Sequence, residues 1–446
     1  MKRRSFLKKS SGLLGLSLAD GFPSISAAGR KLPAAERIRI AVIGVNGRGN
    51  NLLRTFASMK DVEIARICDV DSRVLNRRVS ETKQAGRHDP VGLGDFRKAI
   101  DDKSIDAIVL GTPDHWHAIP SIYACMAGKD VYTEKPDSHN ILESCTMAAA
   151  ARKYKRVVQM GTQARSGPHM KEANQYISSG ALGKVRYATA WESMKQGSLG
   201  RPADGKPPAG VDYDMWLGPA PKRPFNRLRF HGNWRWFFDY GTGDVGNDGV
   251  HRIDYARWAL QTGLEAQGEK LPDLPRSVSA TGGKFYFNDA QEWPDTLMAN
   301  FDYGNCLLTY EMRIWSPYKL HGEAEGAAVY GDKGYVILAN GRWRAFRQGG
   351  ALVKESSGGS NLDQTSIHIQ DFLDCMKSRE KPAADLVTVG HPSSMLCHLA
   401  NASWRSGLTL QFDPATTGFK GNRKADPYLG RAEYRAPWKL PRLSEL

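Results

Sequence analysis

A glycine-rich turn near the start of the chain is the feature that most constrains its fold. Residues 38–49 read IRIAVIGVNGRG, an apolar run followed by Gly44, Gly47 and Gly49 and then by a helical pattern. The apolar run predicts a buried parallel strand, and the glycines predict a tight turn into a helix N-terminus. Free backbone N–H groups at such a helix start favour a negatively charged ligand. The segment therefore predicts the first strand, turn and helix of a dinucleotide-binding domain.

The middle position of the turn departs from the usual pattern, because Asn46 stands where a glycine is expected. Asparagine tolerates positive φ better than most residues, so we expect the turn to be kept. Asp69 follows a second apolar run, 62–68, twenty residues after the last glycine of the turn. A carboxylate there accepts hydrogen bonds from a ribose and repels a 2′-phosphate. We expect NAD rather than NADP, with Arg66 and Arg73 nearby as the features that favour NADP.

The first 28 residues are predicted to be an export signal rather than part of the fold. Arg3 and Arg4 precede Phe-Leu-Lys, a modest apolar stretch at 12–18 and small residues at 26–28. This order is typical of a bacterial twin-arginine signal, and a basic N-terminal arm is the alternative interpretation. The stretch is too short and too polar for a spanning helix. We expect a protein exported to the periplasm or cell envelope.

Charge and cysteine spacing argue against several classes of protein. The formal net charge is +15, but the basic residues are scattered and accompany no nucleic-acid-binding motif. We expect a solvated basic surface that attracts anionic ligands, and no nucleic-acid partner. The six cysteines show neither a CxxC pair nor a zinc-binding pattern. They are interpreted as small core side chains.

Strand and helix patterns alternate from residue 38 to about 160, which implies a parallel, doubly wound sheet. Asn140 and Glu143 form a capping box at the start of one predicted helix. We assign 29–160 to a Rossmann domain. Further strands are expected at 107–110, 130–133 and 157–160.

The pattern changes after about residue 165. Forty residues at about 195–240 are rich in proline, glycine, arginine and aromatic residues, and alternating segments follow them. Alternation predicts antiparallel strands, with a hairpin turn at Gly304-Asn305. We assign 161–415 to a second α/β domain and 416–446 to a C-terminal tail. Strands are expected at 185–191, 277–282, 296–302, 306–313, 327–330 and 334–338, and helices at 168–179, 366–378 and 392–406.

Lys135 stands between Glu134 and Pro136 at the end of the strand predicted at 130–133. Ligands of open α/β sheets bind outside the carboxyl ends of the strands. A lysine fixed there suits contact with a substrate oxygen and proton transfer. A surface lysine before a turn is the alternative interpretation.

Thr112 and Pro113 follow the strand predicted at 107–110, and His115 and His117 come directly after them. The histidines form an HxH pair, which in other contexts binds metal. Because no third ligand is evident, we expect no metal site.

A second polar cluster begins in a glycine-rich loop, 241–249, that runs into an amphipathic helix. At helical spacing, Asn247 or Asp248 shares one face with His251 and with Asp254 or Tyr255. A histidine with acids at a loop-to-helix start resembles a catalytic constellation. An N-capped helix with a structural histidine is the alternative interpretation.

Taken together, these motifs resemble the Gfo/Idh/MocA oxidoreductase family over essentially the whole mature chain. The resemblance rests on the glycine turn and on Thr112-Pro113, His117, Glu134-Lys135-Pro136, His251 and Asp254. Residues 401–405 and 434–438 also resemble the exported bacterial branch of the family.

The resemblance implies a Rossmann domain followed by an α/β domain with a large, mostly antiparallel open sheet, which often forms the oligomer interface. It implies oxidation or reduction of sugars and polyols with NAD(P). The family lysine corresponds to Lys135 and the family histidine to His251. Inositol-dehydrogenase-like members have an acid four residues before the histidine, where this chain has Asn247, and Asp248 is adjacent.

The expected site has three groups of residues. The catalytic residues are expected to be Lys135, His251 and Asp248. The NAD-binding residues are expected to be Gly44, Asn46, Gly47, Arg48, Gly49, Asp69, Thr112, Pro113, His117, Glu134 and Lys135. Substrate contacts are expected at Gln163, Arg165, Trp236 and Asp254, with Trp236 in an aromatic segment that either stacks on a sugar or packs in the core.

Three functions fit these expectations. The first is an exported homo-oligomeric sugar oxidoreductase with tightly bound NAD. The second is an NAD-dependent glycosidase or lyase that oxidises, eliminates and re-reduces, since no free NAD pool is expected outside the cytoplasm. The third is a non-catalytic sugar-binding protein, and the presence of Lys135 argues against it.

Overall fold

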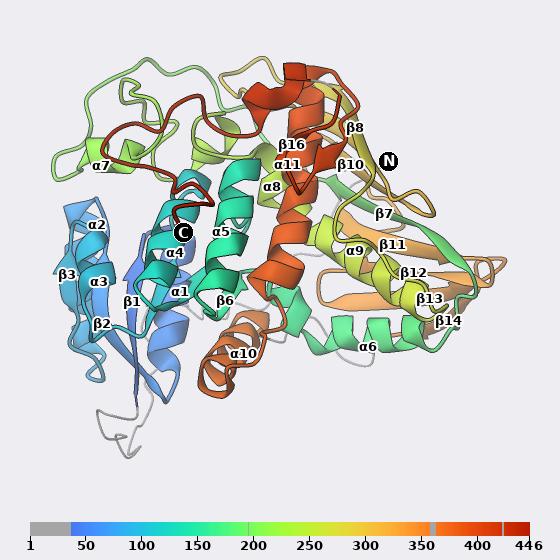
Figure 1. Cartoon of the computed structure of the whole chain (residues 1–446), viewed down its shortest axis with the longest axis horizontal. Coiled ribbons are helices and arrows are strands. Elements are labelled where there is room, and N and C mark those ends of the chain that lie inside the picture. The colour runs from blue at the N-terminus through green and yellow to red at the C-terminus, as the bar shows by residue number, and fades with distance from the viewer. Residues whose placement is uncertain (1–36, 195, 357–362, 422) are drawn as a thin grey trace, which may run out of the picture.

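The computed structural model describes residues 37–446 except 195, 357–362 and 422, so the predicted export signal lies outside the described residues. The described chain builds two sheets side by side, a parallel one formed by the first third of the chain and a larger one formed later (Figure 1). This is the fold class that the sequence predicted. No helix among the described residues combines the length and apolar character needed to cross a bilayer.

The first sheet has six strands in the order β3-β2-β1-β4-β5-β6, and neighbouring strands pair in parallel. The order reverses between β1 and β4, which is the switch point where doubly wound sheets bind ligands. The strands are β1 (Ile38–Ile43), β2 (Val62–Cys68), β3 (Val91–Leu93), β4 (Ala107–Leu110), β5 (Asp130–Thr133) and β6 (Val158–Met160).

Helices cover both faces of this sheet because side chains of each strand alternate between two cores. In β1, Ala41 and Ile43 pack in one core and Ile40 and Val42 in the other. The helices are α1 (Gly47–Ser58), α2 (Ser72–Gln84), α3 (Arg97–Asp101), α4 (Ala118–Met126) and α5 (Ile141–Lys153). The predicted cap of α5 is present, since the Asn140 side chain accepts a hydrogen bond from the Glu143 N–H at 3.0 Å.

The second sheet has eight strands in the order β14-β13-β12-β11-β7-β10-β9-β8. It is mostly antiparallel, and its β7–β10 pair is parallel. The strands are β7 (Val185–Ser193), β8 (Ser277–Gly283), β9 (Thr296–Asp302), β10 (Leu307–Arg313), β11 (Glu325–Gly331), β12 (Gly334–Ala339), β13 (Arg342–Arg347) and β14 (Leu352–Glu355). A two-stranded ribbon, β15 (Phe412–Asp413) with β16 (Gly418–Phe419), follows later.

Helices pack on one face of the large sheet, and the other face carries a row of aromatic side chains that are exposed or partly exposed. Helices α6 (Pro168–Ser178) and α9 (Gly249–Glu265) contact the sheet directly (Figure 1). On the opposite face, Tyr187, Tyr330, Tyr335 and Phe346 stack in a row across four strands at centroid distances of 5.5, 5.5 and 4.9 Å.

Later segments return to the Rossmann core. Helix α10 (Gln364–Ser378) places Phe372 against Phe56 of α1, and Trp438 of the C-terminal segment stacks on Phe96 with ring centroids 5.6 Å apart. The remaining helices are α7 (Tyr213–Leu217), α8 (Gly243–Asn247) and α11 (His391–Ser406). The domain that contains β1, β2 and β5 therefore has a core to which residues from the end of the chain also contribute.

Candidate active site

The glycine turn joins β1 to α1 as predicted, but the backbone conformation of Asn46 differs from the one we expected. Gly44 and Gly47 have the positive φ values, 75° and 44°, whereas Asn46 is extended at φ −88° and ψ 165°. Asn46 therefore needs no left-handed conformation, and our reason for its tolerance was wrong. The helix also begins at Gly47, four residues before the expected pattern at Asn51.

Close backbone contacts make the turn a cradle. A Cβ atom at Gly49 would lie 1.7 Å from the Gly44 carbonyl oxygen, and one at Gly111 would lie 2.5 Å from the Gly49 Cα. The Asn46 side chain makes no capping hydrogen bond to α1. First-turn N–H groups of a helix have no intrahelical partner and attract anions. The turn therefore fits the pyrophosphate of a dinucleotide.

A cavity of about 390 Å³ opens at the carboxyl ends of β1, β2, β4 and β5. Thr112 lies in the cavity wall, and its hydroxyl has no hydrogen-bond partner among the described residues. This is expected for a group that forms a hydrogen bond with a bound ligand. The predicted cofactor residues that line the cavity are Gly44, Asn46, Gly47, Arg48, Asp69, Thr112, Pro113, Glu134 and Lys135. Gly49 and His117 do not line the cavity, and Gly49 instead allows the close packing just described.

Asp69 lies in the cavity wall at the end of β2. Its carboxylate accepts hydrogen bonds from the N–H groups of Val45 at 2.8 Å and Asp71 at 2.9 Å. Burial raises the pKa of Asp69, and these two backbone donors oppose the rise. The two nearby arginines are engaged elsewhere, Arg66 with Asp102 at 2.6 Å and Arg73 with Asp71 at 2.8 Å.

Residues 208–236, here called the crossing segment, reach from the second half of the chain over the loop after β2. The Asp212 N–H donates to the Val70 carbonyl at 2.9 Å, and His231 Nε2 lies 3.0 Å from Asp71 Oδ2. Figure 1 shows α7, in this segment, beside the end of the Rossmann domain. The segment lines the cavity with Met215, Trp216, His231, Gly232, Trp234 and Arg235. Sequence analysis missed this contribution, since no local pattern marks a loop that folds back.

Lys135 lies where the sequence placed it, at the end of β5 and in the cavity wall. Its Nζ donates to the Asn247 carbonyl at 2.6 Å and to Asn247 Oδ1 at 3.2 Å, and lies 3.8 Å from Asp248 Oδ1. The structure therefore brings together Lys135 and Asp248, two of the three predicted catalytic residues, through the end of α8. Asn247, in the position of the family acid, binds the lysine as an acceptor without charge.

His251 lies in the first turn of α9 and is half-buried. Burial, together with the positive charge of Lys135, holds its pKa well below the usual range. The ring is therefore neutral near pH 7 and can accept a proton. Its side chain makes no hydrogen bond to any described residue that the structure records.

Two buried acids stand behind Asp248, and sequence analysis did not connect one of them to the site. Carboxylate oxygens of Glu192, Asp244 and Asp248 lie within 4.8 Å of one another. Burial raises the pKa of Asp244 to about 7 and that of Glu192 well above its usual range, and the carboxylate of Asp248 adds to both shifts. Glu192 comes from β7, more than 50 residues before the others, so sequence spacing gave no signal.

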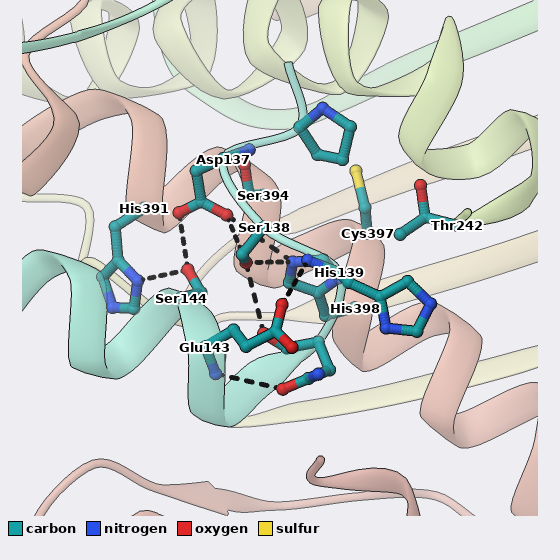
Figure 2. A network of polar contacts seen from close by, with 12 residues as sticks. Asp137, Ser138, His139, Glu143, Ser144, Thr242, His391, Ser394, Cys397 and His398 are labelled. Carbon is teal, nitrogen blue, oxygen red and sulfur yellow. Dashed lines mark hydrogen bonds and ion pairs between the residues drawn. The ribbon is translucent and has the colours of Figure 1, made fainter. Parts of the chain in front are cut away.

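A buried polar network links the residues that follow Lys135 and Pro136 to neighbouring helices, and Figure 2 shows it around Asp137. Asp137, fully buried, accepts hydrogen bonds from the hydroxyls of Ser138 at 2.7 Å and Ser144 at 2.6 Å. Ser144 contacts His391 at 2.8 Å, and Ser138 contacts His398 at 3.1 Å. The loop after Lys135 is thereby tied to both α5 and α11.

The residues predicted to contact substrate are not gathered on one accessible surface. Arg165 and Asp254 form a bidentate ion pair at 2.9 and 2.8 Å, and their side chains are 7 % and 1 % exposed. Gln163 donates to Glu134 at 3.5 Å. Trp236 is buried in the core of the second domain, which is the packing alternative to a sugar-stacking ring. Trp234, two residues earlier, lines the cavity instead.

The fold and cavity define a protein with a dinucleotide-binding Rossmann domain and a second α/β domain that completes its site. Residues 38–162 match the family model described as oxidoreductase family, NAD-binding Rossmann fold. Residues 184–268 match the model described as oxidoreductase family, C-terminal alpha/beta domain. Models of the NAD-binding domain and of the C-terminal domain of the Gfo/Idh/MocA oxidoreductases thus match the two domains of this chain in order, and the first indicates NAD binding.

Curated relatives match over part of their length. A glycosyl hydrolase family 109 protein of Shewanella pealeana is 26% identical over 207 residues, which are 43% of this chain and 45% of the relative. One of Stenotrophomonas maltophilia is 32% identical over 140 residues, 30% of this chain and 29% of the relative. The chain therefore spans about half or less of the length of these relatives.

Solved structures share the fold at low sequence identity. A levoglucosan dehydrogenase in complex with NADH and levoglucosan is 16% identical with a TM-score of 0.64, covering 84% of this chain and 99% of that one. The WlbA dehydrogenase from Bordetella pertussis, in complex with NADH and UDP-GlcNAcA, is 17% identical with a TM-score of 0.62, covering 85% and 98%. At these identities the likeness establishes the fold.

Proposed function

We propose that the protein is an NAD-dependent oxidoreductase that acts on the CH–OH group of a sugar or glycoside. The observation that carries the proposal is Lys135, which reaches the cavity from the end of β5 and is held at its Nζ by Asn247. Bound NAD supplies the hydride acceptor. The related sugar dehydrogenases of the same fold support a sugar as the class of substrate.

The residues around the cavity have separate roles in this proposal. The Lys135 ammonium binds the substrate hydroxyl oxygen and stabilises the negative charge that develops there. His251, neutral because of burial and the charge of Lys135, accepts the hydroxyl proton. Asp248, 3.8 Å from Lys135 Nζ, keeps the lysine oriented. Substrate contact by Gln163, Arg165, Trp236 and Asp254 stays a prediction.

Asp69 should select NAD over NADP and contribute directly to its affinity. We expect Asp69→Ala to weaken NAD binding by about 1–3 kcal/mol, the value of hydrogen bonds to a charged group. Nucleotide released from the denatured protein identifies the native cofactor, and titration of stripped protein gives the affinities. The control is Asp89→Ala, which removes an 86 % exposed carboxylate. Recovery of mostly NADP, or unchanged NAD affinity in Asp69→Ala, would contradict the assignment.

A second candidate function is favoured by the crossing segment. This segment lines the cavity and is bonded to the loop after β2, so it opposes release of a dinucleotide. A cofactor that stays bound suits a closed cycle. Oxidation of a sugar carbinol acidifies the neighbouring C–H, loss of that proton expels the glycosidic oxygen, and addition of water with return of the hydride restores NAD. The relatives named glycosyl hydrolase family 109 support this alternative.

Product analysis separates the two functions. The purified protein is given a panel of glycosides and free sugars without added NAD, and free sugar, keto-sugar and NADH absorbance are followed together. A free aglycone with no net NADH supports the closed cycle. Keto-sugar with one equivalent of NADH per site supports the dehydrogenase. Lack of any turnover and of any bound nucleotide would contradict both and favour a sugar-binding protein.

Two further proposals concern assembly and location. We propose a homo-oligomer that packs the uncovered sheet face with its aromatic row, and light scattering that reports a monomer would refute it. We propose export to the periplasm or cell envelope on the basis of the Arg3-Arg4 motif, which lies outside the described residues. Fractionation of the host that finds only full-length cytoplasmic protein would refute export.

A further inference from the structure

The HxH motif between β4 and α4 has a role that cofactor contact does not explain. His117 is 1 % exposed, and both of its ring nitrogens face backbone carbonyl oxygens. Nδ1 lies 2.6 Å from the Pro136 oxygen, and Nε2 lies 2.9 Å from the Thr112 oxygen. Carbonyl oxygens only accept hydrogen bonds, and a neutral imidazole has a single N–H. Both short contacts are satisfied only when both ring nitrogens carry hydrogen.

His115 provides a contrast within the same motif. Its Nε2 lies 2.9 Å from the Trp216 oxygen, whereas its Nδ1 lies 3.3 Å from the Tyr240 oxygen. One N–H suffices for this arrangement. Burial and the charge of Arg431 lower the pKa of His115 to about 3, so this ring is neutral. The two histidines therefore differ in the number of short contacts that need a donor.

A buried carboxyl group lies three residues before His117. Asp114 is 2 % exposed and accepts hydrogen bonds from the Thr242 N–H at 3.1 Å and the Thr242 hydroxyl at 2.7 Å. Burial raises the pKa of Asp114, and the charges of His117 and Lys135 oppose that rise. A buried imidazolium with a hydrogen-bonded carboxylate nearby is a tolerated arrangement, whereas an isolated one is costly.

These contacts connect the segment Asp114–His117 to Lys135 by two separate routes. His117 holds the Pro136 carbonyl, directly after Lys135, and Asp114 holds Thr242, directly before α8. The last residue of α8, Asn247, accepts the hydrogen bond from Lys135 Nζ. The side chain and the backbone of Lys135 are thus fixed by one segment, Asp114–His117, along two routes.

We propose that His117 is a doubly protonated positioning residue which, with Asp114, sets the place of Lys135 in the cavity. The proposal rests on the role of Lys135 given above. His117 itself does not line the cavity, so it acts through Lys135 rather than on substrate or cofactor. A displacement of about 1 Å at a reacting group lowers rates by about 10²-fold.

The protonation state is tested without any turnover. Ring ¹⁵N NMR of the wild-type protein, with histidine signals assigned through backbone connectivities, reports which nitrogens carry hydrogen. We expect two protonated nitrogens in His117 and one in His115 at the working pH. A bare ring nitrogen in His117 would overturn the proposal, and this readout needs no variant to fold.

The positioning role is tested by coupling. We expect His117→Gln, whose amide nitrogen cannot reach both carbonyls, to slow single-turnover hydride transfer by about 10²-fold. In a Lys135→Ala background, the same change should cost no more than about twofold, because both act through one group. His88→Gln is the matched control and should leave the rate within about twofold, since its buried ring contacts Ile64 and Ala57, which do not line the cavity. Equal losses from His117→Gln in both backgrounds would overturn the proposal.

Failure of the role proposed for Lys135 can be distinguished from failure of the proposal for His117. An unchanged rate in Lys135→Ala would refute the role proposed for the lysine, while the NMR result on His117 would stand independently.

Discussion

Lys135→Ala is expected to lower single-turnover hydride transfer by about 10²–10⁴-fold, the usual contribution of positioned proton transfer. The reason is geometric, since the Lys135 Nζ is the cation that Asn247 and Asp248 hold at the cavity wall. Bound NAD should be retained, because the glycine turn and Asp69 provide the expected pyrophosphate and ribose contacts. Rapid mixing of NAD-loaded protein with substrate, followed at the NADH absorbance, measures the step.

Lys129→Ala is the matched control for this change. Lys129 is another buried lysine, whose Nζ donates to the carbonyls of Asp102 at 2.7 Å and Ile105 at 2.8 Å, and it does not line the cavity. Its loss should affect stability and leave hydride transfer unchanged. His251→Ala should slow the step less than Lys135→Ala, because no acid among the described residues forms a recorded hydrogen bond or ion pair with the His251 ring. If Lys135→Ala kept a near-normal rate of hydride transfer and His251→Ala were inactive, the roles assigned to the two residues would be wrong.

Much of the Rossmann domain follows from local patterns. The strands at 38–43, 62–68, 107–110 and 130–133 lie where the mostly apolar runs do, since a strand buried on both faces is a near-continuous apolar run. Residues at strand ends point to the cavity, so Asp69 and Lys135 were placed correctly from position alone. The short edge strand β3, two of its three residues exposed, has no such run and was missed.

What the sequence could not supply are contacts between distant segments. Glu192 on β7 joins Asp244 and Asp248 only because β7 packs against α9, which directly follows α8. The crossing segment has no hydrophobic periodicity. Its place over the loop after β2 depends on individual hydrogen bonds such as that between His231 and Asp71. A local pattern also cannot tell a charged residue that faces a ligand from one that faces a buried partner.

Arg165→Ala is expected to lower the free energy of unfolding by about 3–5 kcal/mol, because it leaves the Asp254 carboxylate buried without its cation. The two side chains bond bidentately at 2.9 and 2.8 Å, and the Ser393 hydroxyl adds only one further donor to Asp254 at 2.7 Å.

Urea denaturation of Arg165→Ala measures this loss against two controls. Arg276→Ala breaks the ion pair with Asp302, in which the arginine is 67 % exposed, and should change stability by no more than about 1 kcal/mol. The double change Arg165→Met with Asp254→Leu removes both charges and should recover much of the loss, since apolar replacements of buried ion pairs are often neutral. If Arg165→Ala were as stable as the wild type but bound sugar weakly, the arginine would be a substrate contact, as its sequence position suggested. A large loss of stability in Arg165→Ala that the double change restores would show that the Arg165–Asp254 pair is a structural contact. It would then hold the segment after β6 against helix α9.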